Sequence, residues 1–416
     1  MFDQLFKRAH TINRHSAAPL LDERLRYLTH CGSQGITKSS LQSIAAHLLV
    51  FIDYLDLKAD GKISVEQINA AADLWVSRRP QPKNVTDYRG VRMSFISNAK
   101  QWLRFLGRLR PPEVTRQPYA DMIEEFTNYM TGERGLASRT IRGRCWYLAQ
   151  FFSRFYQQHR PFNEISIVDI DADIARKSEQ DSYARSTIQS YAAALRSFFR
   201  YAEQRGWCAP RLAVAIMSPR LFADEQLPKG PSWEDVQRLL ATTEGDTRKK
   251  IRDRAVIMLF AVYGLRVGEV RALRLEDLDW EQELMSVTRP KARRKQTYPL
   301  SYTMGESLLR YLKEVRPRVA YREVFLTLRA PFHPPSSSSL YRVVGDRLPA
   351  LGVTLKHCGP HSLRHACAAR LLAEGLSLKE IGDHLGHRKT DTTRVYAKVD
   401  LAGLRQVADF DLGGVL

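Results

Sequence analysis

Two stretches of this 416-residue chain, beginning at Gly35 and Gly135, share one pattern of apolar residues. They read "GITKSSLQSIAAHLLVFIDYL" and "GLASRTIRGRCWYLAQFFSRF". After a glycine and a polar residue suited to begin a helix, apolar residues recur three or four positions apart. This spacing places the apolar side chains on one face of a helix, and such a face must pack against other elements. We therefore expect two compact helical units in the first half of the chain.

The segments that follow these two stretches are also alike. An Ile-Ser pair opens another helix at Ile63 and again at Ile165, and a long basic amphipathic helix comes next in both places. We interpret this as duplication of one small helical domain, although any two four-helix units would share some of this periodicity. The segments 110–120 and 221–236 contain prolines and predict linkers. The predicted domains are residues 1–112, 118–210 and 228–416.

The last part of the chain mixes helix and strand patterns. "LMSVTRP" and "QTYPLS" predict two antiparallel strands around the basic turn "KARRK". Ser232, with Asp235 three residues later, predicts the start of a helix, and "PPSSSSL" at residues 334–340 predicts a short surface loop. The predicted fold class is multidomain and mainly α, with helical domains followed by an α+β domain that has a small antiparallel sheet.

The composition favours a polyanionic partner. The formal net charge is +19, and a surplus of this size suits nucleic acid first and an anionic membrane surface second. RNA binding also fits the charge, which cannot decide among these. No apolar run approaches the roughly 20 residues of a membrane helix, and the N-terminus has no signal-peptide core, so we expect a cytoplasmic protein. The five cysteines are scattered without a C-x-x-C pair, which predicts reduced thiols and no zinc site.

Three segments of the last part carry residues suited to phosphate chemistry. In "YGLRVGEV", Arg266 follows a turn at Gly264 in an apolar neighbourhood, so it needs an acid such as Glu269 or a phosphate. The basic turn "KARRK" is either a solvated tip or an element that enters a DNA groove. The third segment, "HSLRHACAARLLAEGLSLKEIGDHLGHRKTDTTRVYAKV", runs from residue 361 to residue 399.

Side chains of the third segment complete one chemical set. His361 and Arg364 stand three apart on one helix face, His387 follows a turn at Gly386, and Tyr396 comes nine residues later. Taken singly, each is more often a structural residue. Together, two arginines can clamp a phosphodiester and stabilise its transition state, and a tyrosine can attack phosphorus. A histidine can help that tyrosine to ionise, and a hairpin lysine can protonate the leaving oxygen. This set needs no metal and no cofactor.

These motifs resemble those of the tyrosine recombinase (phage integrase) family. "YGLRVGEVRALRLEDLDW", "HSLRHACAARLL" and "LGHRKTDTTRVYAKV" resemble its signature boxes in order and spacing. Residues 118–208 resemble, more weakly, its helical (SAM-like) core-binding domain, and residues 1–110 look like a further DNA-binding domain, a second copy of the core-binding type in our interpretation. Lys295 is the alternative to Lys291, because Ala292 stands where the family usually has glycine. The resemblance implies these catalytic residues: Arg266, Lys291, His361, Arg364, His387 and Tyr396.

The resemblance also implies an activity and partners. It implies a site-specific DNA recombinase or integrase, of the transposase type, that cleaves and rejoins strands through a covalent 3′-phosphotyrosyl intermediate without metal or ATP. Its partners would be double-stranded DNA, further copies of the chain (a dimer on each site and a tetramer in the synapse that passes through a Holliday junction) and co-encoded recombinases. Its location would be the cytoplasm, in association with the nucleoid.

Basic residues are the predicted DNA contacts. For any single residue of the core-binding group, a structural salt bridge is the alternative. The hairpin group consists of Arg289, Arg293, Arg294 and Lys295. The core-binding group consists of Arg139, Arg142, Arg144, Arg185 and Arg196.

Two other functions stay open. A type IB topoisomerase uses a similar constellation to relax supercoils. An accessory DNA-binding subunit would be expected to have lost the nucleophile or an arginine, and all six positions are filled here.

Overall fold

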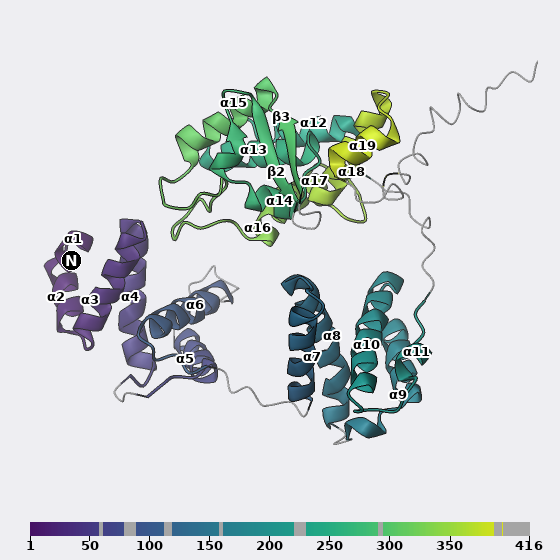
Figure 1. Ribbon diagram of the computed structural model, residues 1–416. Helices are drawn as coiled ribbons and strands as arrows, with labels where there is room; N and C mark the ends of the chain where they lie inside the picture. Colours follow the sequence, from purple (N-terminus) through teal and green to yellow (C-terminus); the bar gives the residue numbers. More distant parts are fainter. Residues whose placement is uncertain are drawn as a thin grey trace, which may run out of the picture. The chain divides into compact units, whose positions relative to one another are not determined.

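The computed structural model describes residues 1–57, 61–78, 89–111, 119–157, 161–219, 230–289, 294–386 and 393, without the side chains of residues 156, 157 and 294. It divides into two compact units, residues 112–225 and the remainder. Three large hydrophobic cores lie within residues 2–109, 119–216 and 233–366. Figure 1 labels the helices and strands that form them. The domain limits given above stay a prediction.

The first core is formed by helices whose starts are capped by side chains. Thr37 accepts a hydrogen bond from the Ser40 amide, and Ser64 and Gln67 form a reciprocal capping box. Phe51, Phe95 and Trp102 are at most 1% exposed and pack together in this core. The helices are α1 Phe2–Leu5, α2 Ala9–Ala17, α3 Leu21–Ser33, α4 Lys38–Tyr54, α5 Val65–Ser77 and α6 Arg89–Phe105.

The second core is dominated by phenylalanine rings. Phe126 and Phe198 meet edge to face with their centroids 5.3 Å apart, and Phe151, Phe152 and Phe199 pack around them. Ser166 and Asp169 form the capping box of α9, at the predicted Ile-Ser opening. The helices are α7 Ala120–Gly132, α8 Ser138–Gln157, the short η1 Phe162–Glu164, α9 Ile167–Glu179, α10 Arg185–Gln204 and α11 Leu212–Ala215.

The last part of the chain combines helices with a three-stranded antiparallel sheet of order β1-β2-β3, which confirms the predicted fold class. Its strands are β1 Leu278–Asp279, β2 Leu284–Arg289 and β3 Arg294–Pro299, with Val287 opposite Gln296. Ser232 caps α12 as predicted. The helices are α12 Trp233–Ala241, α13 Arg248–Ala261, α14 Val267–Ala272, η2 Leu275–Asp277, α15 Tyr302–Arg310, η3 Tyr311–Val315, α16 Ser337–Gly345, α17 Arg347–Ala350, α18 Pro360–Ala373 and α19 Leu378–Leu385.

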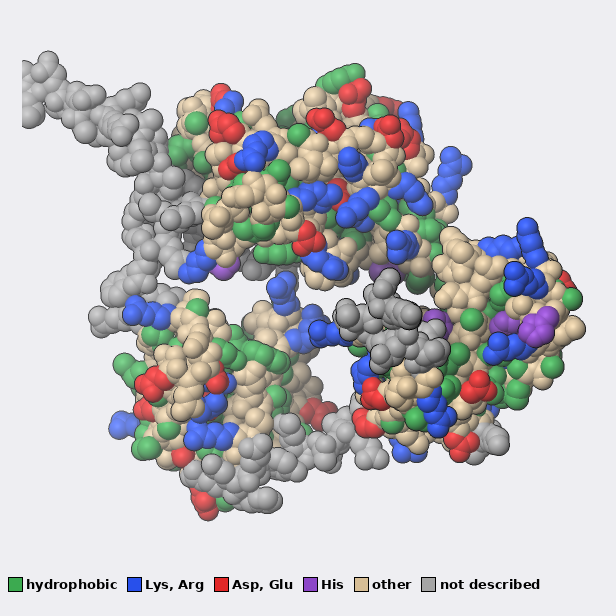
Figure 2. Space-filling model, turned by 180° about the vertical axis from the view of Figure 1, so that it is seen from behind, with side chains coloured by type: hydrophobic (Ala, Val, Ile, Leu, Met, Phe, Trp, Pro, Cys, Tyr) green, Lys and Arg blue, Asp and Glu red, His purple; other side chains and the backbone are tan. Residues whose placement is uncertain are grey.

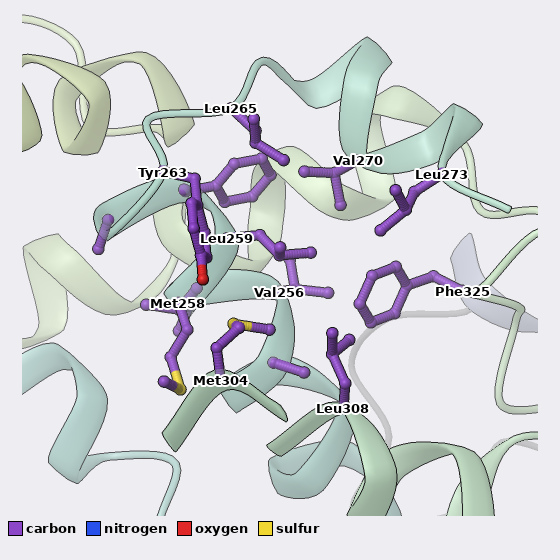
Figure 3. Packing of buried hydrophobic residues seen from close by; sticks show 14 of the residues in the cluster. Val256, Met258, Leu259, Tyr263, Leu265, Val270, Leu273, Met304, Leu308 and Phe325 are labelled. Carbon is purple, nitrogen blue, oxygen red and sulfur yellow. The ribbon is translucent and has the colours of Figure 1, made fainter. Parts of the chain in front are cut away.

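Helix α13 is the centre of this last part. Nine of its fourteen residues are buried, including Val256 and Leu259, which are fully enclosed. Figure 3 shows these two side chains surrounded by Met304 and Leu308 of α15 and by Phe325. Since α13 is held on all sides, the turn that follows it is placed firmly.

The predicted loop at residues 334–340 is wrong in part. Helix α16 begins at Ser337, and the Ser336 side chain accepts a hydrogen bond from the Ser339 amide at 3.1 Å. Serine is a preferred residue at the start of a helix, so a serine run after two prolines is a capping signal as much as a loop signal.

Among the described residues, no helix is long and apolar enough to span a membrane. Lys and Arg side chains are spread over the face shown in Figure 2, with Asp and Glu side chains among them.

Candidate active site

The turn after α13 brings Arg266 to the start of α14. Gly264 has a φ of +59°, and a Cβ atom there would lie 2.5 Å from the Leu385 side chain of α19. A glycine is therefore required by both the backbone and the packing. Leu265 is buried beside α13, so the chain continues directly from the core to Arg266 (Figure 3).

Glu269 orients Arg266, as its spacing in the sequence suggested. Its carboxylate is 4% exposed and accepts hydrogen bonds from the Arg266 amide at 2.8 Å and from Arg266 Nη1 at 2.9 Å. The Arg266 side chain nevertheless stays 43% exposed. One edge of the guanidinium is fixed by protein, and the other is available to an incoming oxyanion.

Arg364 joins α18 to the Gly264 turn and to the end of α19. Its side chain is buried, Nη1 donates to the Gly264 carbonyl at 2.5 Å, and Nη2 donates to the Leu385 carbonyl at 2.6 Å. Pro360 occupies the first turn of α18, where its missing N–H costs no hydrogen bond.

His361 lies in the field of both arginines. Displacement of water by protein lowers the pKa of its imidazole, and the positive charges of Arg364 and then Arg266 lower it further. The structure thus brings together three of the predicted residues, Arg266, His361 and Arg364. A histidine in the field of two arginines can accept a proton when an anionic group arrives.

His365 was missed from the sequence. Its ring meets the His361 ring edge to face, with centroids 4.6 Å apart. Burial, followed by the charges of His361 and Arg364, lowers the pKa of His365 to about 4, so it is neutral at pH 7. Its position four residues after His361, on the same helix face, was the available signal.

Arg289 does not have the environment of a DNA contact, in contrast to the prediction. Its side chain is 4% exposed, and Nη1 donates to Glu269 Oε1 at 3.3 Å and to the Leu385 carbonyl at 2.6 Å. Nη2 donates to the Tyr298 hydroxyl and to the His384 carbonyl. The cause is the twofold alternation of β2, which turns Met285, Val287 and Arg289 towards the core.

The end of α19 is fastened to the hairpin. The Tyr298 hydroxyl donates to the His384 carbonyl at 2.5 Å, and Gln296 Nε2 donates to the Asp383 carbonyl at 2.8 Å. Gly386 ends the helix with a φ of +64°, and a Cβ atom there would lie 2.2 Å from Arg289 Cζ. The backbone that leads into His387 is therefore held against Arg289.

Four predicted residues, Lys291, Arg293, His387 and Tyr396, lie outside the described residues, as does the Arg294 side chain. Thr393, three residues before Tyr396, is described and is 2% exposed, and its Oγ1 would lie 2.9 Å from a Cβ on Gly382 of α19. The Lys295 side chain is 57% exposed and lies 3.4 Å from Asp277.

The predicted core-binding arginines fall into two groups. Arg139, Arg142 and Arg185 are exposed. Arg144 and Arg196 are half-buried: Arg144 Nη1 donates to Ser197 Oγ at 3.0 Å, and Arg196 Nη2 donates to the Ile216 carbonyl at 2.9 Å. Within the described part of the chain, no three His, Cys, Asp or Glu side chains gather as a metal site.

Comparison with known proteins gives two matches to family descriptions. Residues 232–402 match "Phage integrase family", and residues 123–206 match "Phage integrase, N-terminal SAM-like domain". A putative integrase/recombinase, y4rA of Sinorhizobium fredii, is 34% identical over 71% of this chain and 72% of its own length. Tyrosine recombinase XerD of Listeria monocytogenes serotype 4b is 30% identical over 69% of this chain and 97% of its own.

A solved structure supports the fold. XerH site-specific recombinase bound to palindromic difH substrate, in a post-cleavage complex, aligns with a TM-score of 0.53. The alignment covers 72% of this chain and 99% of XerH at 17% identity, a level at which the likeness concerns the fold alone.

Proposed function

We propose a function from the premise that this chain belongs to the phage integrase family, the tyrosine recombinases. It is accordingly a DNA strand transferase of site-specific recombination. The finer proposal is that it cleaves and rejoins DNA through a covalent 3′-phosphotyrosyl intermediate, on behalf of a mobile element.

The juxtaposition of Arg266, His361 and Arg364 carries this proposal. Arg266 is held by the buried Glu269 on one edge and is 43% exposed, so it can donate to a nonbridging phosphate oxygen. His361 lies within the field of both arginines. The exposed Arg266 guanidinium, with the added positive charge of the buried Arg364, would stabilise the charge that develops on the equatorial oxygens when a nucleophile attacks.

The reaction we propose is a pair of transesterifications. The Tyr396 hydroxyl loses its proton, assisted by a histidine, and its oxygen bonds to phosphorus as the bond to the 5′-oxygen breaks. Lys291 donates a proton to that leaving oxygen, which departs as a 5′-hydroxyl. A 5′-hydroxyl of a second duplex then attacks the phosphotyrosine, frees Tyr396 and restores a phosphodiester. The energy of the broken bond is kept in the intermediate, so no ATP is consumed.

Further copies of the chain belong to this proposal. Strand exchange joins two duplexes, so we propose a dimer on each DNA site, a tetramer in the synapse and a Holliday-junction intermediate. The mobile-element role is part of the same proposal, and it rests on the word integrase in the name of y4rA, a putative integrase/recombinase. Association with the nucleoid and with co-encoded recombinases is part of the same proposal.

A suicide-substrate assay tests the chemistry. The protein is incubated in EDTA with nicked duplexes that cover the DNA flanking its gene, and adducts are resolved on a denaturing gel. We expect a covalent protein–DNA adduct with the natural chain and none with Tyr396→Phe. Binding without an adduct on every substrate would favour the accessory-subunit function instead. Relaxation of a supercoiled plasmid without exchange between duplexes would favour a topoisomerase.

A further inference from the structure

The main-chain carbonyl at the end of α13 connects three helices. Val262 ends this helix, four residues before Arg266. Its carbonyl oxygen accepts a hydrogen bond from Cys367 Sγ of α18 at 3.3 Å and another from the imidazole of His384 of α19. The last carbonyls of a helix have no partner within the helix, so donors from elsewhere fix the course of the chain beyond it. The path into Arg266 therefore depends on two side chains outside the predicted catalytic set.

The hairpin holds His384 from another side. Its ring meets the Tyr298 ring of β3 edge to face, with centroids 5.4 Å apart. The Tyr298 hydroxyl donates to the main-chain carbonyl of the same histidine at 2.5 Å, and Arg289 Nη2 and Gln296 Nε2 donate to that carbonyl as well. The hairpin thus supports both the ring and the backbone of His384, and the ring is placed to reach the end of α13.

One nitrogen of the His384 ring is left over. Nε2 is buried and has no hydrogen-bond partner among the described residues. Burial, followed by the charges of Arg289 and Arg364, lowers the pKa of His384, so the ring is neutral at pH 7 and the hydrogen given to Val262 lies on Nδ1.

Packing alone does not explain a histidine at position 384. A buried nitrogen without a partner destabilises the folded state. A leucine would pack on Tyr298 and leave no such nitrogen, and the Val262 carbonyl would keep its bond from Cys367. A residue that departs from the locally favourable choice is expected where function requires it.

The bond between His384 and Val262 joins two segments that carry predicted catalytic residues. His384 lies three residues before His387, and Val262 lies four residues before Arg266. Arg364 connects the same segments, because it donates to the Gly264 and Leu385 carbonyls. A donor that has to meet a phosphate oxygen is sensitive to a small shift of the turn that carries it, even when the shift originates away from the chemistry.

From these contacts we infer that His384 is a positioning residue for strand cleavage: its hydrogen bond to the Val262 carbonyl holds the turn that carries Arg266 against the end of α19. This inference rests on the proposed function. His384 acts through Arg266 and touches neither the DNA nor the reacting atoms.

Two substitutions in the full chain separate the hydrogen bond from the packing of the ring. His384→Leu keeps an apolar side chain on Tyr298 and has no donor, whereas His384→Asn keeps an N–H group as many bonds from the backbone as Nδ1. Tyr311→Phe is the matched control. Tyr311 is fully buried, and its hydroxyl accepts from the Leu326 amide at 3.0 Å, so this variant also loses one buried hydrogen bond to the main chain.

The rate of adduct formation and the DNA affinity are measured separately. Single-turnover reactions on a nicked duplex give the rate. Fluorescence anisotropy across a range of NaCl concentrations gives the affinity and its salt slope, the slope of log affinity against log salt. We expect His384→Leu to slow adduct formation by about 10- to 100-fold. His384→Asn should react within about five-fold of the natural chain, and Tyr311→Phe within about two-fold. Affinity and salt slope should not change, since no phosphate contact is lost.

A double variant tests the route through Arg266. In the Arg266→Gln background, His384→Leu should slow the reaction by less than about two-fold, because two changes that act on one group are not additive. A loss in that background as large as the loss in the natural chain overturns the inference.

Thermal melting followed by circular dichroism separates positioning from stability. His384→Leu should melt no lower than the natural chain, because it removes the unpartnered nitrogen. The inference is overturned if His384→Leu reacts at the natural rate, or if the Leu and Asn variants lose the same rate. It is also overturned if the Leu variant melts lower and cooling restores its rate.

The natural chain distinguishes this inference from the proposed function. A natural chain that forms no adduct in the suicide-substrate assay refutes the proposed function and this inference with it. A natural chain that forms the adduct, matched by His384→Leu, refutes the inference alone.

Discussion

Asp173 of α9 and Glu269 of α14 are both buried carboxylates that pair with an arginine three residues away. The Asp173 carboxylate is fully enclosed, and it accepts from the Tyr191 hydroxyl at 2.5 Å and from Arg176 Nη2 at 2.8 Å. The other side of Arg176 is used by Asp181 at 3.2 Å. Asp173 and Arg176 are therefore both paired with other groups of the same helical unit.

The Glu269 cluster differs in what it leaves open. Glu269 accepts hydrogen bonds from Arg266 and from the buried Arg289. Arg266 nevertheless keeps 43% of its side chain exposed, and its charge acts on His361. Among the described residues, Glu269 is the sole ionic partner of Arg266. The comparison teaches that a buried charge pair alone does not mark a site. An arginine that is oriented by protein and still has free donors does mark one.

The largest expected difference is in the rate of strand cleavage. Arg266→Gln should slow formation of the covalent adduct by about 10²- to 10³-fold, because it removes a donor aimed at the charge that develops in the transition state. The matched variant Arg176→Gln, which also removes an arginine paired to a buried acid, should leave the rate within about two-fold. Single-turnover rates on a nicked duplex measure both. Equal losses in the two variants would erase the distinction between the clusters.

The second difference concerns stability. Asp173→Asn removes the enclosed carboxylate that accepts from Tyr191 and Arg176 and should lower the free energy of unfolding of its unit by about 3 kcal/mol. Its adduct rate, measured at a temperature where the variant is folded, should match that of the natural chain. Chemical denaturation followed by circular dichroism measures the first quantity. A large rate loss in the folded variant would show that the second unit takes part in the chemistry.

The fold was largely predictable from the sequence because its signals are local. The starts of α5, α9 and α12 are set by Ser64, Ser166 and Ser232, whose side chains cap the helices that follow them. The pairing of Arg266 with Glu269 was also local, since three residues separate them at the start of a helix.

Non-local contacts account for what the sequence did not reveal. Arg289 and the Leu385 carbonyl are far apart in the chain and meet only when the hairpin packs on α19. The basic run around Arg289 suggested a DNA contact. The alternation of buried and exposed residues along β2 instead places the Arg289 side chain in the interior.

A third test decides whether Arg289 supports the end of α19 or contacts DNA. Arg289→Met keeps an apolar stem in place but removes the hydrogen bonds to Glu269 and to the end of α19. We expect adduct formation to slow by about 10- to 100-fold, roughly 1.4–2.7 kcal/mol of barrier, because the backbone before His387 loses its support. The salt slope of DNA binding should stay unchanged. A slope that falls by about one with a normal cleavage rate would restore the predicted DNA contact.

The smallest expected effect is a dependence of stability on pH in the part of the chain that contains Glu269. The pKa of His365 is lowered from 6.5 to about 4 in the folded chain, so between these pH values the unfolded chain binds the proton more readily. The contribution of His365 to stability is therefore complete above pH 6.5 and is lost as the pH falls towards 4. Partial solvent exposure screens the effect, and we expect roughly 1–2 kcal/mol.

Calorimetry of the full chain between pH 7 and pH 4 measures this loss. His365→Gln has no titrating ring and should flatten the acid dependence of the transition that contains α18, while the transition of the Asp173 unit keeps its own dependence. If the natural chain and the variant lose stability in parallel across this range, the acid sensitivity lies in another group. The edge-to-face contact of His365 with His361 would then be a packing contact alone. If only the transition that contains α18 depends on pH, the titrating group is His365, one turn from His361, which lies in the field of both arginines. Acidification should then destabilise the active site before it unfolds the second unit.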